Sequence, residues 1–381
     1  MEALLKKGID SLNLDRSNWQ LVKFGDVAIQ QKQSVDRENT DITRYVKGEH
    51  MYSEDIHLRE WGELKDEYLG PAFIRYFEKG DILYGSRRTY LRKVTVAPFE
   101  GITSNTTFVI KANENMINKY LLPFLMLSDE FTEHSIQNSK GSVNPYINWK
   151  DIANYEFLLP SKEQHAEIAE LLWSTDKVIQ EDLKVLKTLE NLLYAKTKSF
   201  FQDSQNKIKI KEIVIDKACK KAEVGLSPYI EIGDIDTFNK KIIFKDKESV
   251  KGSIIASQDS VLVSKVRPYR GAVHILKEDQ IVTNGFSILN VNEAKSSPSF
   301  LFYCIAWNKD FYYQMSRLSA GSTYPTVEDE DILGYSIPYV DENLQKEYVE
   351  KIDQIYTAFS NIESKINKTK NLLNVLINQI F

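Results

Sequence analysis

The last part of the chain carries a row of mainly apolar residues at alternating steps of three and four. The row comprises Ile352, Ile355, Phe359, Ile362, Ile366, Thr369, Leu373, Leu376 and Ile380. This alternation predicts a long helix with a coiled-coil seam. Because a helix that packs on a globular core carries a wider apolar stripe, the narrow row indicates that its partner is another long helix.

The same row occurs about 180 residues earlier, with two polar interruptions. It comprises Leu172, Thr175, Ile179, Asp182, Leu186, Leu189, Leu193, Lys196 and Phe200. With about 40 residues at about 1.5 Å of rise per residue, each helix would span roughly 60 Å. A single helix of this kind could be a packing element without a function of its own. Two copies, each after a globular stretch, favour a scaffold.

The globular stretches repeat with the same period. The first stretch predicts a strand that runs into a turn at residues 19–27, further strands at 81–84, 93–97, 106–111 and 155–159, and a helix at 120–135. In the second, residues 207–215, 258–269 and 321–327 correspond to residues 19–27, 80–90 and 141–147. The sequence therefore predicts an α+β fold with two mixed α/β globular units in an internal pseudo-twofold repeat of about 180 residues. The predicted boundaries are 1–159 for the first globular domain, 160–203 for the first long helix, 204–340 for the second domain and 341–381 for the second helix.

Composition places the chain among ordinary soluble proteins. Its 381 residues are 42% hydrophobic and 27% charged, with a net charge of −5. No run of 18 apolar residues is present and the N-terminal residues lack a signal-peptide core, so we expect a cytoplasmic protein. Cys219 and Cys304 predict neither a disulfide framework nor a zinc cluster. The net charge does not exclude DNA binding, which depends on where the Lys and Arg residues gather.

The sequence carries no motif of a known catalytic centre. Searches for a phosphate-binding P-loop, a dinucleotide-binding glycine motif, a hydrolase nucleophile elbow and a zinc-protease helix are all negative. The segment Asn144-Pro145-Tyr146 comes near the tetrapeptide of amino-methyltransferases but lacks its second proline. The five histidines have no ligand-like spacing with cysteines or acids. We therefore predict a chain that is not catalytic and binds no metal.

Basic and aromatic residues gather in loops at matching places in the two halves. The first cluster comprises Arg87, Arg88, Tyr90, Arg92 and Lys93, and the second comprises Lys265, Arg267, Tyr269 and Arg270. Such loops can contact phosphates, and Arg can bind guanine edges in bidentate fashion. Either cluster alone could be a solvated turn, but recurrence favours a nucleic-acid surface. Neighbouring loops add the candidate DNA-binding residues Asn105, Lys140, Ser142, Tyr146, Asn284, Ser322, Thr323 and Tyr324.

The order of these elements resembles the specificity subunit of Type I restriction-modification enzymes. The most telling residues are Leu159-Pro-Ser-Lys-Glu-Gln-His-Ala-Glu-Ile-Ala at the start of the first long helix and the two Gly-Ser-x-x-Pro loops at Gly141 and Gly321. The start of the second helix departs from the pattern, because Asp341-Glu-Asn-Leu-Gln replaces the Glu-Gln form. The resemblance covers nearly the whole chain.

The resemblance implies two target recognition domains, each of which recognises one half of a bipartite double-stranded DNA target. It implies that the two helices pair antiparallel as a spacer, with a seam that includes Leu172, Ile179, Leu186, Leu193, Ile352, Phe359, Ile366 and Leu373. It also implies two methyltransferase subunits that bind S-adenosylmethionine, and restriction subunits that use ATP and Mg, with no cofactor on this chain. Two alternatives stay open: a stand-alone methyltransferase or nuclease with unrecognised motifs, and a coiled-coil adaptor without a nucleic-acid role.

Overall fold

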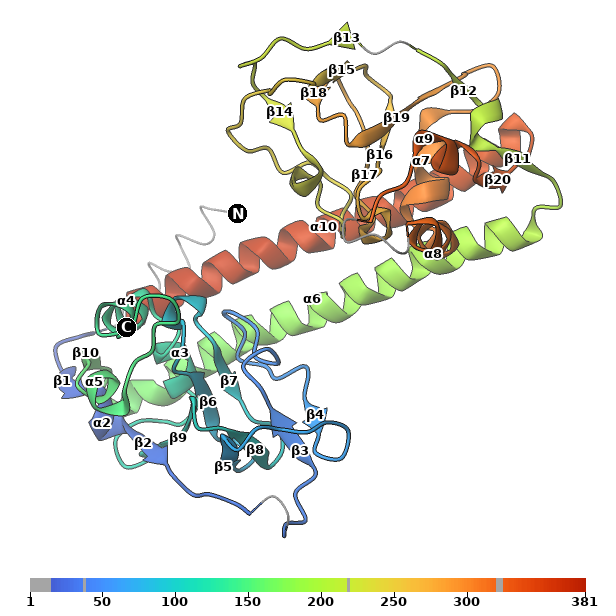
Figure 1. The fold of residues 1–381 in the computed structure, drawn as a ribbon. Coiled ribbons are helices and arrows are strands. Elements are labelled where there is room, and N and C mark those ends of the chain that lie inside the picture. The colour runs from blue at the N-terminus through green and yellow to red at the C-terminus, as the bar shows by residue number, and fades with distance from the viewer. Residues whose placement is uncertain (1–14, 37–38, 218–219, 320–324) are drawn as a thin grey trace. The chain divides into compact units, whose positions relative to one another are not determined.

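The computed structural model describes residues 15–36, 39–217, 220–319 and 325–381. The chain divides into two compact units, one made of the residues up to Glu181 together with Ile366–Phe381, the other of Asp182–Lys365. The long helices α6 (Lys162–Asp203) and α10 (Glu342–Ile380) each run through both units (Figure 1). Each globular domain therefore forms a unit with a segment of both helices.

The first domain contains two four-stranded sheets and a two-stranded ladder. Its elements are β1 (Gln20–Lys23), α2 (Phe24–Val27), β2 (Ala28–Gln31), β3 (Arg44–Val46), β4 (Gly62–Glu63), β5 (Phe73–Phe77), β6 (Ile82–Gly85), η1 (Thr89–Leu91), β7 (Val94–Val96), β8 (Gly101–Ser104), β9 (Thr107–Ala112), α3 (Leu122–Leu125), α4 (Asp129–Gln137), α5 (Trp149–Ala153) and β10 (Glu156–Leu159). The sheets have the strand orders β2-β9-β6-β7 and β4-β3-β8-β5, and β1 pairs with β10. Phe77, Leu83 and Val109, from β5, β6 and β9, are fully buried in one apolar cluster.

The second domain repeats this topology except for one edge strand. Its elements are β11 (Lys207–Lys209), η2 (Ile210–Glu212), β12 (Val214–Ile215), β13 (Lys220–Lys221), β14 (Tyr229–Ile230), η3 (Ile232–Asp234), β15 (Ile254–Ala256), β16 (Val261–Ser264), η4 (Pro268–Arg270), β17 (Val273–Ile275), β18 (Gln280–Val282), β19 (Phe286–Val291), α7 (Pro298–Ala306), α8 (Lys309–Leu318), α9 (Asp329–Leu333) and β20 (Ser336–Pro338). The order β12-β19-β16-β17 matches β2-β9-β6-β7, and β11 pairs with β20 as β1 does with β10. The edge strand β4 lies next to β3 in the first domain, whereas β13 lies next to β15, the counterpart of β5, in the second.

One parallel strand pair in each domain shows which strands of the two domains correspond. Tyr45 of β3 lies opposite Ile102 of β8, and Tyr229 of β14 lies opposite Ile281 of β18. Every other strand pair among the named strands of the described residues is antiparallel. The predicted α+β fold with an internal repeat is therefore confirmed.

Two predicted elements are interrupted in the structure. The helix expected at residues 120–135 is instead divided into α3, which ends at Leu125, and α4, which Ser128 caps by accepting a hydrogen bond from Phe131 N–H. The strand expected at residues 207–215 is interrupted by the turn η2. In the first domain, α2 separates β1 from β2 in the same way. Alternating apolar residues alone do not reveal such a turn.

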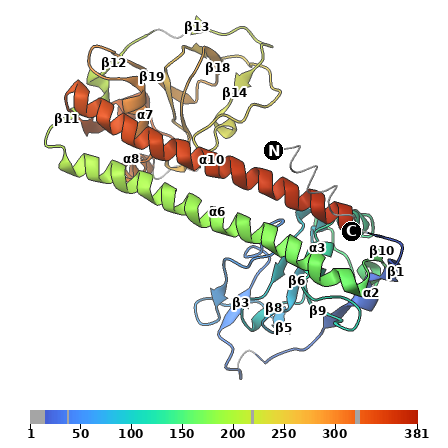
Figure 2. The ribbon, with the colours of Figure 1, turned by 180° about the vertical axis from the view of Figure 1, so that it is seen from behind.

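The helices run antiparallel where they pack together in the second unit (Figure 2). Thr197 Oγ1 lies 3.0 Å from Tyr348 Oη, and Lys365 Nζ lies 2.9 Å from an Asp182 carboxylate oxygen. Residue numbers thus rise along one helix as they fall along the other.

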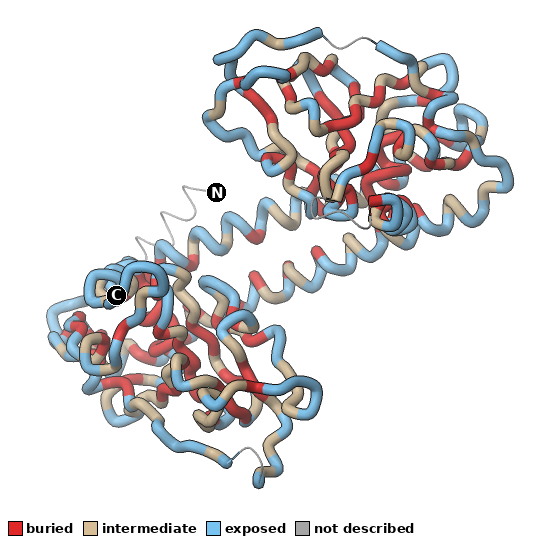
Figure 3. The backbone as a smooth tube through the Cα atoms, in the orientation of Figure 1, coloured by how far each residue is buried: buried red, intermediate tan, exposed pale blue. Residues whose placement is uncertain are grey.

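The seam residues face inward along both helices. Buried residues fill the domain interiors and recur along the helices (Figure 3). The residues Leu172, Ile179, Leu186, Leu193, Ile352, Phe359, Ile366 and Leu373 are each at most 9% exposed. Lys196 is exposed, whereas Thr197 beside it is 1% exposed. The predicted seam position Lys196 is therefore wrong: Thr197 takes its place, with its hydroxyl against that of Tyr348.

None of the helices in the described part of the chain is long and apolar enough to cross a membrane.

We expect Phe359→Ala to destabilise the second unit by about 3–5 kcal/mol, since truncation of a buried aromatic ring leaves a cavity. The Phe359 ring is fully buried and lies 5.0 Å from the Phe238 ring and 5.8 Å from the Trp307 ring, centroid to centroid. Urea unfolding measures the change. Thr357→Ala, at an exposed position of the same helix, should shift stability by less than about 0.5 kcal/mol, and equal losses for both variants would contradict the seam packing.

Candidate nucleic-acid interface

In the first domain, three loops meet beyond the end of β6. Ser86 N–H donates to the Thr106 carbonyl oxygen at 3.2 Å, and Ile147 N–H donates to the Ser86 carbonyl oxygen at 2.9 Å. Arg88 N–H donates to the Pro145 carbonyl oxygen at 2.7 Å. We call the exposed side of these loops the first contact surface, with its members in residues 86–93, 104–106 and 139–147.

The second domain assembles the same three loops in the same way. Lys265 N–H donates to the Gly285 carbonyl oxygen at 2.9 Å, and Val327 N–H donates to the Lys265 carbonyl oxygen at 3.0 Å. Arg267 N–H donates to the Pro325 carbonyl oxygen at 2.8 Å. We call this the second contact surface, with its members in residues 265–271, 283–285 and 325–327.

The basic loops have matching backbones. Arg88 and Arg267 both lie in the left-handed region, with φ values of 51° and 46°, directly before the turns η1 and η4. Few residues other than glycine adopt this conformation, and they keep it only where the surroundings fix it. The backbone bonds to Pro145 and Pro325 fix it here, so each basic loop is a rigid platform.

Most of the predicted DNA-binding residues in the described parts of these loops are exposed. The exposed members are Arg87, Arg88, Tyr90, Asn105, Lys140, Ser142, Tyr146, Tyr269, Arg270 and Asn284. Arg267 is half-buried. The predicted members Ser322, Thr323 and Tyr324 lie outside the described residues.

Other predicted cations are engaged within their own domain. The Arg92 guanidinium lies 2.7 Å from the Asp129 carboxylate and 3.2 Å from that of Glu54, and its side chain is 18% exposed. Lys93 donates to the Gly48 carbonyl oxygen, and burial lowers the pKa of its amine. Two neutralising carboxylates make Arg92 a clamp between a loop and α4, and its charge is therefore less available to a phosphate.

Two further cations have a single acidic partner. Lys140 lies 3.2 Å from Asp151, and Lys265 lies 3.1 Å from Asp329. Ion pairs this close to the surface contribute little to stability, so a phosphate can replace the carboxylate.

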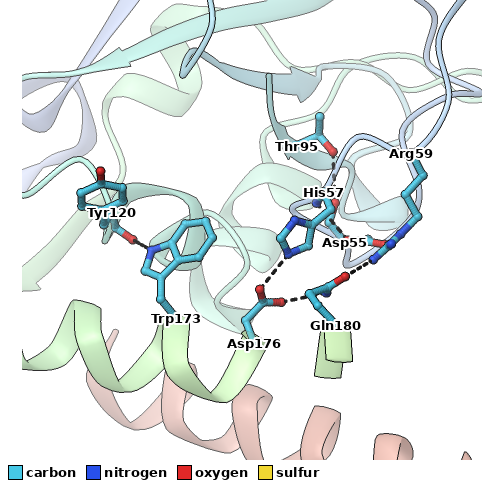
Figure 4. Close-up of polar contacts among 8 residues, drawn as sticks. All are labelled: Asp55, His57, Arg59, Thr95, Tyr120, Trp173, Asp176 and Gln180. Carbon is cyan, nitrogen blue, oxygen red and sulfur yellow. Dashed lines mark hydrogen bonds and ion pairs between the residues drawn. The ribbon is translucent and has the colours of Figure 1, made fainter. Parts of the chain in front are cut away.

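The structure reveals a polar network that sequence reasoning missed. His57 Nε2 lies 2.7 Å from Asp176 Oδ2 of α6, and Arg59 Nη2 donates to Gln180 Oε1 of the same helix at 2.7 Å (Figure 4). In the sequence, His57 has no ligand-like spacing with cysteines or acids and belongs to no motif. The sequence feature that could have indicated this network is the acidic residue Asp176, which directly follows the predicted seam position Thr175.

Within the described ranges of the chain, no group of three His, Cys, Asp or Glu side chains is placed to hold a metal ion. The surfaces that recur in both domains are built from hydrogen-bond donors, cations and tyrosines, which suit phosphates and base edges.

Comparison with known proteins agrees with this geometry. The family profile described as "Type I restriction modification DNA specificity domain" matches residues 16–191 and again residues 197–371. The Type I restriction enzyme HindI specificity subunit of Haemophilus influenzae is 24% identical over 193 residues, or 49% of this chain and 41% of that protein. The EcoDI specificity subunit of Escherichia coli is 27% identical over 161 residues, or 40% of this chain and 33% of that protein. The chain thus aligns with less than half the length of these curated relatives.

Solved structures share the fold. The S subunit of the Type I restriction-modification system from M. genitalium is 12% identical, with a TM-score of 0.60 over 97% of this chain and 98% of that one. A chain from a study of complex assembly and conformational transition in the type I R-M system is 19% identical, with a TM-score of 0.55 over 96% of both chains. Since the family profile covers most of the sequence in two copies, this chain belongs to the Type I restriction-modification DNA specificity family.

Proposed function

We propose that the chain is the DNA-recognition subunit of a Type I restriction-modification complex, in which each globular domain recognises one half of a bipartite target. The observation that carries the proposal is an arrangement that occurs in both domains. An arginine with a left-handed backbone conformation precedes a short turn, and two neighbouring loops contact it beyond equivalent strands. A solvated turn has no reason to recur with the same backbone geometry and the same hydrogen bonds to its neighbours.

The two contact surfaces provide suitable chemistry for DNA. Exposed guanidinium groups such as those of Arg87, Arg88 and Arg270 can bind phosphate oxygens or the O6 and N7 atoms of guanine. The exposed amides of Asn105 and Asn284 can bind the N6 and N7 atoms of adenine. In this proposal most of the cations contact phosphates, because such contacts make up about half to two-thirds of protein–DNA hydrogen bonds.

The long helices have a separate role in the proposal. They set the gap between the half-sites recognised by domains 1–159 and 204–340, and they bind two methyltransferase subunits. Support for helix-mediated binding comes from the outer side of α6, where Val178, Val185 and Leu192 are 42%, 44% and 38% exposed at heptad steps. The methyltransferase subunits would supply S-adenosylmethionine and the restriction subunits ATP and Mg, in the cytoplasm, while this chain takes no part in the chemistry.

Arg88→Ala and Arg270→Ala should each weaken binding to specific and scrambled duplexes alike. The loss of one phosphate contact should also lower the slope of log affinity against log salt by about one. Fluorescence anisotropy over a salt series measures both quantities.

Lys119→Ala is the charge-matched control, because Lys119 is exposed and lies outside the contact loops of the first domain. It should leave the slope unchanged. If Arg88→Ala and Arg270→Ala behaved like this control, the basic loops would not belong to the interface.

Exchange of residues 19–158 for the equivalent domain of a relative should alter one half-site and preserve the other, since the two contact surfaces are built from separate loops. Methylation mapping of cells that carry the chimaera reports both half-sites. A simultaneous change in both halves would argue against independent recognition.

A matched four-residue insertion in α6 after Glu181 and in α10 before Ile366, where each helix passes from one compact unit into the other, should lengthen the recognised gap. Four residues add about 6 Å, the rise of nearly two base pairs. Matching insertions keep the antiparallel helices aligned. A folded, active variant that still required the original gap would refute the spacer role of the helices.

A further inference from the structure

A short segment in each domain joins a long helix to the end of the basic loop. We call residues 54–59 the first strap and residues 236–241 the second strap. The contact surfaces defined above include neither segment.

The first strap is bound to α6 through side chains (Figure 4). His57 Nε2 lies 2.7 Å from Asp176 Oδ2, and Arg59 Nη2 donates to Gln180 Oε1 at 2.7 Å. Gln180 Nε2 in turn donates to Asp176 Oδ1 at 3.2 Å. Asp176 is only 6% exposed, whereas His57 is half-buried and Arg59 is exposed, so the anchor joins a buried carboxylate to groups at the surface.

The other side of the first strap is bound to the basic loop. Glu54 N–H donates to the Arg92 carbonyl oxygen at 3.1 Å, and the Arg92 guanidinium forms an ion pair with the Glu54 carboxylate at 3.2 Å. Thr95 Oγ1 donates to the Asp55 carbonyl oxygen at 3.1 Å. Arg92 ends the turn that begins after Arg88. The strap thus connects helix α6 to the far end of the loop that bears the exposed arginines.

The second strap makes the same connection with different residues. Asn239 Nδ2 donates to Glu363 Oε1 of α10 at 2.8 Å, and Tyr356 Oη of α10 donates to the Asn239 carbonyl oxygen at 2.6 Å. The next residue, Lys240, donates from Nζ to the Gly271 carbonyl oxygen at 2.9 Å. Gly271 ends the turn that begins after Arg267.

Lys240 shows how firmly this second connection is held. Its side chain is 2% exposed, and its amine also donates to the Thr237 carbonyl oxygen and lies over the rings of Trp307 and Tyr312. Burial lowers the pKa of the amine to about 8. A buried amine is tolerated only with such partners, so displacement of Gly271 would cost this amine one of its two hydrogen bonds in a site that water does not reach.

The helix anchors occupy equivalent positions but are chemically unrelated. Asp176 and Tyr356 are one sequence repeat apart, as are Arg92 and Gly271, yet a carboxylate–imidazole pair in one unit corresponds to a phenol–carbonyl bond in the other. The connection between helix and basic loop therefore recurs although the residues that make it differ. Packing alone would not require each strap to contact the end of the loop.

We infer that the straps are positioning elements: each fixes its basic loop relative to the long helix, so that this anchor governs how sharply the domain discriminates its half-site. The inference rests on the proposed function. It assigns His57, Asp176, Asn239 and Tyr356 a role in specificity without contact with DNA.

The chain offers matched variants for a test. Asp176→Ala removes the His57 contact of the first strap and leaves that of Arg59 with Gln180, whereas Asp176→Asn keeps an acceptor for His57. Tyr356→Phe removes the phenol contact of the second strap and leaves that of Asn239 with Glu363. Tyr303→Phe removes another bond between domain and helix, from Tyr303 Oη to Asp353 Oδ1 at 2.7 Å, that involves no strap residue.

The experiment uses the full chain in complex with its methyltransferase subunits. Affinity is measured for the target obtained by methylation mapping and for two duplexes with one half-site scrambled, and thermal unfolding verifies that each variant folds. Asp176→Ala should reduce discrimination at the half-site of the first domain by about threefold to thirtyfold, and Tyr356→Phe should do so at the other half-site only. Asp176→Asn and Tyr303→Phe should stay within about twofold of the parent.

Three results would overturn the inference: unchanged discrimination in both anchor variants, equal loss at both half-sites, or a loss in Tyr303→Phe as large as in Tyr356→Phe. If Asp176→Ala does not fold, the two tyrosine variants decide alone. Failure of the parent complex to discriminate any of the duplexes would instead refute the proposed function.

Discussion

The packing of α6 against α10 is the interaction on which the rest of the structure depends. Neither globular domain completes its core alone: the ring of Phe381, the residue after α10, lies 6.3 Å from the Phe157 ring in the first domain, and the Tyr194 ring of α6 lies 5.7 Å from the Trp307 ring in the second. Each compact unit therefore includes parts of both helices. Apolar burial along the seam stabilises the domains as well as the helices.

This arrangement explains which features could be predicted from the sequence. The seam positions follow from local periodicity, which a single helix imposes on its own residues. The correspondence between the loops of the two domains could be predicted because each loop motif appears twice in the same order. Because the domain is duplicated, each loop motif could be recognised in two places in the sequence.

Features that depend on distant partners could not be predicted. The sequence gives no sign that Arg92 is neutralised by Glu54 and Asp129, because these carboxylates come from another loop and from α4. His57 and Asp176 are 119 residues apart, and neither belongs to a motif. Ser128 interrupts a continuous apolar stretch through a cap that only the fold reveals. Side-chain partnerships across a domain are set by tertiary packing, which periodicity does not describe.

If two similar surfaces recognise two separate DNA half-sites, methylation mapping of cells that express the complex should show it directly. We expect one modified motif with two defined halves and a gap of fixed length and unspecified sequence, and its loss on deletion of this chain. A single uninterrupted motif, or methylation that persisted without the chain, would contradict recognition of two half-sites by the two domains.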